Sequence, residues 1–61
     1  MRLTVVKLKV GDLVANDSGD IGKVLAFKRD GAVITWGEHP PGVFSDEQLQ
    51  RFGVVLVEGQ R

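Results

Sequence analysis

Cysteine is absent from this chain of 61 residues, which also has no tyrosine and a single histidine, His39. Without cysteine there is no disulfide and no thiolate metal site. One histidine cannot build a zinc site unless acidic residues or a symmetry-related copy join it. A domain this small buries only about 60% of the surface that its unfolded chain exposes. We therefore expect no metal and no cofactor, and oligomerisation is the remaining means of extra stability.

An excess of charge is also lacking, because eight basic residues are balanced by eight acidic ones. Such a chain has no gross positive field of the kind typical of nucleic-acid binders, although a local basic patch stays open. No apolar run approaches the roughly 20 residues that span a membrane. Lys7 and Lys9 interrupt the N-terminal apolar stretch, which does not fit a signal peptide. We expect one cytoplasmic domain over residues 1–61, with no membrane partner.

What the sequence does contain is a succession of short strand patterns. Residues 3–10 alternate at period two, which predicts a half-buried strand. Asp30 and Gly31 stand between two apolar runs, which predicts a tight hairpin. The turn formers of residues 16–20 predict a polar turn. The further strands are predicted at residues 13–15, 21–28, 32–36, 43–44 and 54–58.

One short helix is predicted before the last strand. Ser45 followed three residues later by Gln48 matches a capping box, with two acidic residues in the first turn. Gly53 is placed to end the helix. Pro40 and Pro41 cannot donate hydrogen bonds to a sheet, so the residues around them predict a loop.

This order of elements resembles the SH3-like barrel superfold over roughly residues 10–57. The matching segments are "GDLV", a polar loop, "GKVLAF", a tight hairpin, "AVITW", a helical turn and a closing strand. The resemblance implies an all-β, SH3-like small barrel of five or six short strands with one short helical turn before the last strand. It does not identify a function, since superfolds host many unrelated functions.

The strands of the predicted hairpin are apolar on both faces. An antiparallel sheet with one wet face alternates apolar with polar residues. Only one face fills the core, so we expect the other face, with Leu25, Phe27 and Val33, to be covered. Either a loop and the first eight residues cover it, or these three side chains form a self-association or partner interface.

A contact site is predicted around the proline loop. The candidate partner-binding residues are Trp36, His39, Phe44, Lys28 and Arg29. Trp36 and Phe44 flank the loop as exposed anchors, since aromatic side chains carry much of the energy of small interfaces. Lys28 and Arg29 would steer association. Cation-binding aromatic cages need about three converging rings, and core packing is the preferred interpretation for most of the four aromatic residues here.

No catalytic constellation is recognised, and no catalytic residue is assigned. Ser18 and Ser45 are explained by turn and cap roles, and a lone loop histidine such as His39 is more often solvated than catalytic. We expect that the protein is not an enzyme.

A second resemblance, to KOW-type barrels, rests on "GDLV" followed by "GKVLAF". It implies RNA contacts from a basic loop, here Lys23, Lys28 and Arg29, through phosphates. Asp12, and the three further aspartates of the same loops, would repel phosphate.

A third resemblance is to the plasmid-borne type II dihydrofolate reductases, which are also small SH3-like barrels. It rests on "GDLVANDSGDIGKVLAF" followed by "HPPGVFSDEQLQRF", and it implies a tetramer whose central pore binds folate and NADPH. The family's Val-Gln-Ile-Tyr pore motif is replaced here by Val43-Phe44-Ser45, and its pore lysine falls near Asn16.

The interpretation that these observations favour is a non-enzymatic interaction module, an accessory protein of bacterial or phage type. It would bind a protein partner or itself as a homo-oligomer. Nucleic-acid binding and an oligomeric reductase are the alternatives left open.

Overall fold

Five short β-strands and two short helical segments make up residues 3–57, the part of the chain that the computed structural model describes. In chain order they are the 3-10 helix η1 (Val5–Lys7), β1 (Leu13–Ala15), β2 (Ile21–Lys28), β3 (Gly31–Trp36), β4 (Gly42–Phe44), α1 (Asp46–Arg51) and β5 (Val55–Leu56). The prediction of an all-β domain is confirmed. Neither helical segment within residues 3–57 has the length and apolarity that a membrane crossing requires.

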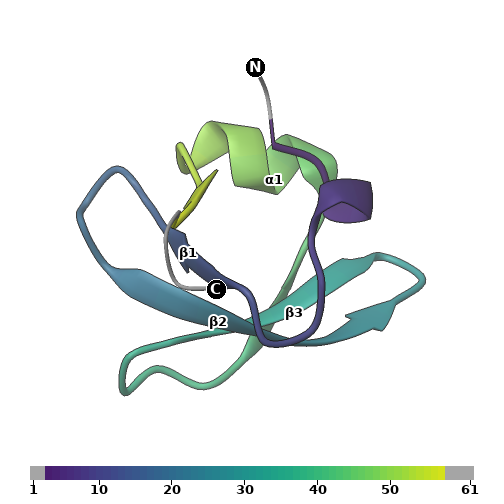
Figure 1. Ribbon diagram of the computed structural model, residues 1–61, viewed down its shortest axis with the longest axis horizontal. Coiled ribbons are helices and arrows are strands. Elements are labelled where there is room, and N and C mark those ends of the chain that lie inside the picture. The colour runs from purple at the N-terminus through teal and green to yellow at the C-terminus, as the bar shows by residue number, and fades with distance from the viewer. Residues whose placement is uncertain (1–2, 58–61) are drawn as a thin grey trace.

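All five strands belong to one antiparallel sheet, in the order β4-β3-β2-β1-β5. The order begins at β4 and ends at β5, and closure into a barrel is not among the pairings of the described residues. The sheet curves, so that α1 lies across the interior from β2 and β3 (Figure 1). The short connection through α1 joins the two edge strands.

The core fills the space between the sheet and α1. Val14, Val24 and Ile34 project from β1, β2 and β3, and Leu49 of α1 meets them from the other side, each fully buried. The remaining members of this cluster are Leu8, Ala32, Trp36 and Val54. Within residues 3–57 this set of eight buried hydrophobic side chains is small, which agrees with the marginal stability expected of a domain of this size.

The hairpin of β2 and β3 is the longest ladder of the sheet. Its pairs run from Gly22 opposite Trp36 at one end to Lys28 opposite Gly31 at the other. The predicted hairpin is present, but Arg29 and Asp30 form its turn, and Gly31, with φ +151°, is the first residue of β3. The register shifts between Val24 and Ala26, so Leu25 falls in a β-bulge.

The prediction of a strand over residues 3–10 is wrong. Val5–Lys7 form a 3-10 turn, and of Thr4, Val6, Leu8 and Val10, which alternation would place on one face, only Leu8 is buried while Val6 is 89% exposed. Side-chain carboxylates satisfy the backbone here in place of a ladder: Val5 N donates to Asp46 Oδ1 at 2.7 Å and Lys9 N donates to Asp12 Oδ2 at 2.9 Å. Alternation in the sequence does not distinguish these partners from a neighbouring strand.

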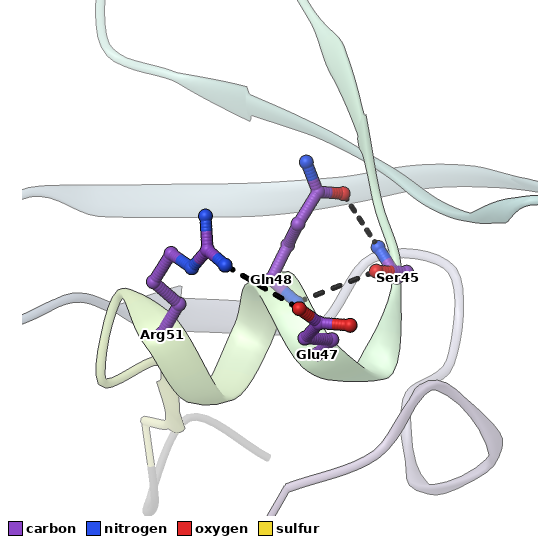
Figure 2. A network of polar contacts seen from close by, with 4 residues as sticks. All are labelled: Ser45, Glu47, Gln48 and Arg51. Atoms are coloured by element: carbon purple, nitrogen blue, oxygen red, sulfur yellow. Dashed lines mark hydrogen bonds and ion pairs between the residues drawn. The ribbon is translucent and has the colours of Figure 1, made fainter.

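The predicted capping box of α1 is confirmed. Ser45 N donates to Gln48 Oε1 at 3.0 Å, and Gln48 N donates to Ser45 Oγ at 3.3 Å (Figure 2). Arg51 and Glu47 form an exposed ion pair at 3.3 Å on the same helix, an arrangement that contributes little to stability. Gly53 ends the helix with φ +63°, so Phe52 stands at a defined corner of the chain.

Candidate functional site

Three aromatic rings from three different elements pack against one another. Trp36 closes β3, Phe44 closes β4 and Phe52 is the C-terminal cap of α1. The ring centroids of Trp36 and Phe44 lie 6.0 Å apart with an interplanar angle of 74°. Those of Phe44 and Phe52 lie 6.1 Å apart at 77°. These edge-to-face pairs are favoured by the ring quadrupoles, so Phe44 holds the other two rings in place.

The three rings differ in their exposure to solvent. Trp36 is only 9% exposed and belongs to the core, whereas Phe44 is half-buried and Phe52 is 46% exposed. The prediction that Trp36 is an exposed anchor is therefore wrong. Of the three rings, Phe52 is the one most exposed to solvent.

The rings form the apolar wall of a pocket of about 280 Å³. His39, Pro40 and Gly42 of the proline loop complete one side, and Asn16 and Asp20 complete the other. Of the predicted partner-binding residues, Trp36, His39 and Phe44 are thus brought together. His39 N donates to Trp36 O at 2.9 Å, which folds the loop back over the end of β3.

The polar side of the pocket is held by a dense set of hydrogen bonds. Asn16 Oδ1 accepts from both Ser18 N and Asp20 N, each at 3.0 Å. Asn16 N donates to Asp20 O at 3.2 Å, and Gly19 takes φ +85° inside the turn. The predicted turn is confirmed, and its function is to present Asp20 at a fixed position beside the rings.

Two glycines permit the close approaches that build the pocket. A Cβ on Gly22 would lie 2.7 Å from the Trp36 ring and 2.8 Å from Ile34 Cγ2, so the absence of a side chain lets the Trp36 ring pack closely against β2. A Cβ on Gly53 would collide with the carboxylate of Asp17. Asp17 N donates to Phe52 O at 3.0 Å. This contact brings the polar turn next to the end of α1.

A second hollow adjoins the pocket. It has a volume of about 240 Å³ and shares Asp20, Trp36 and His39 with the pocket, while Glu38 and Ile21 line its far side. The shared residues form the ridge between an aromatic hollow and a hollow with two carboxylates.

Lys28 and Arg29 do not belong to this site. They lie at the opposite end of the β2–β3 ladder, at the hairpin turn. There they line a separate hollow of about 410 Å³ together with Asp46 and Glu47 of α1. The predicted contact site is therefore divided between two ends of the molecule.

The three predicted self-association residues do not share one face of the sheet. Residues directly opposite one another in a ladder project to the same side, and consecutive residues alternate. Val33 pairs with Ala26 whereas Phe27 pairs with Ala32, so Val33 and Phe27 project to opposite sides. The bulge at Leu25 causes this switch. Leu25 and Phe27 are 42% and 43% exposed, and Val33 is half-buried.

Metal-ligating side chains do not gather anywhere in residues 3–57: no group of three or more histidine, cysteine, aspartate or glutamate residues lies close enough to hold an ion. The Ser45 hydroxyl is engaged in the helix cap. His39 is exposed and lines the pocket without a neighbouring serine among the lining residues described.

Comparisons with known proteins do not assign the chain to a family. No family model matches the chain, and neither a curated protein nor a solved structure matches it.

The pocket residues that the sequence did not assign to the site are Asn16, Asp20, Pro40, Gly42 and Phe52. Asn16 and Asp20 were explained by turn formation, and Phe52 by the helix. These three are brought in by contacts between segments far apart in the chain, such as Asp17 N to Phe52 O. Only the proximity of Pro40 to His39 was available as a local signal.

Proposed function

We propose that this protein is a non-enzymatic interaction module that binds a segment of a partner protein in the pocket formed by Trp36, Phe44 and Phe52. The observation that carries the proposal is the three-ring wall, in which Phe44 contacts both neighbours edge to face. The order of strands along the chain, with α1 before β5, also agrees with the SH3-like superfold that we propose for it.

Preorganisation supports a binding role for this end of the molecule. The pocket is made by loops and element ends resting on a rigid sheet, which is where contact residues concentrate. Phe52 offers an exposed ring, and aromatic side chains at the centre of a contact contribute most of its binding energy. The hydrogen bonds to Asn16 and the close packing of Trp36 on Gly22 hold the pocket walls in place without a partner. Such preorganisation lowers the entropic cost of binding.

Selection from a random-peptide display library tests the proposal. Phe52→Ala removes the exposed ring of the pocket, and Phe27→Ala is the matched control, since Phe27 is 43% and Phe52 46% exposed. We expect peptides selected on the wild-type protein to keep their affinity for F27A. Their affinity for F52A should fall about 10-fold, the effect of losing about 1–2 kcal/mol at an aromatic contact.

Equal losses in F27A and F52A would contradict the proposal, and so would a failure to enrich any peptide on the folded protein. Urea unfolding of both variants serves as the control for stability. The two half-exposed rings should cost a similar, small amount of stability, about 1 kcal/mol each.

Self-association is a second candidate, favoured by the outer face of the sheet. Ala15 of β1 pairs with Ile21 of β2 on one side and with Val55 of β5 on the other. The side chains of Ile21 and Val55 are 51% and 58% exposed. Val33 lies on the same face, since Ile21 and Val33 share the alternation set by the β2–β3 ladder. Native mass spectrometry of the wild-type protein and of Val55→Asp tests it. A dimer or tetramer that V55D converts to monomer would favour this candidate, and a monomeric wild type would reject it.

Nucleic-acid binding has weaker support. Lys28 and Arg29 share their hollow with Asp30, Asp46 and Glu47, and carboxylates repel phosphates. A steep salt dependence of RNA or DNA binding that is lost in a Lys23, Lys28 and Arg29 triple alanine variant would favour it over the peptide-binding proposal.

A further inference from the structure

The rim of the aromatic pocket carries charge of one sign. Asp20 lines both the pocket and the adjoining hollow, and Glu38 lines the hollow. Within residues 3–57, no lysine or arginine lines either space. The chain as a whole is neutral, so this local excess of carboxylates arises from the fold and not from composition.

The carboxylate of Asp20 is available for a ligand. In the described part of the chain, Asp20 uses its backbone N and O in the turn with Asn16, and its side chain takes part in neither a hydrogen bond nor an ion pair. The turn holds the backbone of Asp20 beside the pocket, and its exposed side chain is left to pair with a ligand.

Aromatic faces and a carboxylate together favour a cation. A ring attracts a positive charge within about 6 Å of its centroid, and the attraction rises when the site is partly shielded from water. A neutral apolar ligand would use the rings and leave Asp20 unused. An anion would be repelled by Asp20 and Glu38.

Arginine fits these walls better than lysine does. Its flat guanidinium stacks on aromatic faces while its donors pair with a carboxylate in a fork geometry. The pocket, at about 280 Å³, lies just below the range of about 300–1,000 Å³ typical of small-molecule and cofactor sites. Its size suits a single side chain delivered by a peptide.

From these observations we propose that the pocket of Trp36, Phe44 and Phe52 binds an arginine side chain from an extended segment of a partner protein, with Asp20 as the carboxylate partner. This inference rests on the proposed function and specifies its ligand. The adjoining hollow, with Glu38 at its far side, gives the flanking residues of the segment a place beside the ridge of Trp36 and His39.

Short capped peptides test the inference directly. The probes are pentapeptides with a central arginine, citrulline or leucine between glycines, added up to about 10 mM so that a dissociation constant near 1 mM is measurable. Citrulline keeps the shape of arginine and removes its charge. The readout is the indole N–H signal in a ¹⁵N correlation spectrum, which reports the pocket and the adjoining hollow because Trp36 is the only tryptophan and lines both.

We expect the arginine peptide to shift the Trp36 indole signal and to bind about 3-fold or more tightly than the citrulline peptide, the range of an exposed cation–π or ion pair. Asp20→Asn should lower the affinity for the arginine peptide about 2- to 5-fold and leave the affinity for the leucine peptide unchanged. Asp30→Asn, at the hairpin turn, is the matched control and should change neither.

Three outcomes overturn the inference. Equal binding of arginine and citrulline peptides would show that charge is not recognised, and the proposed function would stand. Binding of the leucine peptide alone would identify an apolar site, again leaving the proposed function intact. If no peptide, including those from the display selection, shifts the Trp36 signal, the inference and the proposed function both fail.

Discussion

The two ends of the β2–β3 ladder differ in how many parts of the chain build them. At one end Trp36 lies over Gly22, and the polar turn, the proline loop, β4 and the end of α1 all meet there. At the other end a short turn joins Lys28 to Gly31, and charged residues of both signs surround it. The aromatic end brings together the polar turn, the proline loop and the end of α1, whereas the hairpin end is packed against the end of β4 and the start of α1, where Gly31 contacts Phe44 O and Ala32 pairs with Phe44. Side chains that are neighbours in one hairpin can thus belong to surfaces with different roles.

Trp36→Ala should show the largest difference in stability between variants of the two ends. Removing a large buried aromatic side chain costs about 3–5 kcal/mol, and a core of this size rarely supplies more than about 3–5 kcal/mol in total. We expect this variant to be largely unfolded at 25 °C by circular dichroism. Phe27→Ala, at the hairpin end, should remain folded. A W36A protein with a wild-type urea midpoint would show that the ring does not support the core.

Gly22→Ala should have the next largest effect. The added Cβ would lie 2.7 Å from the Trp36 ring, and overpacking of this kind costs about 1–3 kcal/mol. Gly42→Ala is the control, because its Cβ would meet Phe44 at an ordinary 3.4 Å, and its effect should stay within about 0.5 kcal/mol. Chemical unfolding measures both. Equal midpoints for the two variants would contradict the close packing of Trp36 on β2.

A double Lys28→Ala, Arg29→Ala variant should have the smallest effect. The hairpin turn lies five residues along β3 from Trp36, about 17 Å at 3.4 Å per residue. The Debye length at physiological ionic strength is only about 8 Å. We therefore expect the affinity and the association rate of a peptide at the pocket, measured by stopped-flow fluorescence, to change less than about 2-fold. This expectation differs from the sequence-based prediction that these two residues steer association. A larger change would mean that the two ends form one contact surface.

Elements with a strong local signal were predictable from the sequence. The Ser45–Gln48 cap, the Asp30-Gly31 hairpin and the polar turn with Asn16 each follow from side-chain chemistry within a few residues, and each is confirmed. Because such features need no distant partner, local reasoning suffices for them.

Features set by tertiary contacts were not predictable in this way. Residues 3–10 alternate like a strand, yet Asp46 and Asp12 bind their backbone instead of a neighbouring strand. The bulge at Leu25 moves Phe27 to the side opposite Val33, and no residue type marks that position. Phe52 joins the pocket through the Asp17 hydrogen bond, a contact between residues 35 positions apart in the chain.

Mapping of amide chemical shifts, with a peptide obtained by selection on the wild-type protein, tests the central claim most directly. The account predicts that the largest shifts fall in three segments that meet at the pocket: residues 16–20, residues 36–44 and Phe52. Signals of Arg29 and Asp30 should stay unchanged. Largest shifts at the hairpin turn, or on the outer face around Ile21 and Val55, would contradict it and move the contact site to the other end or the other face of the sheet.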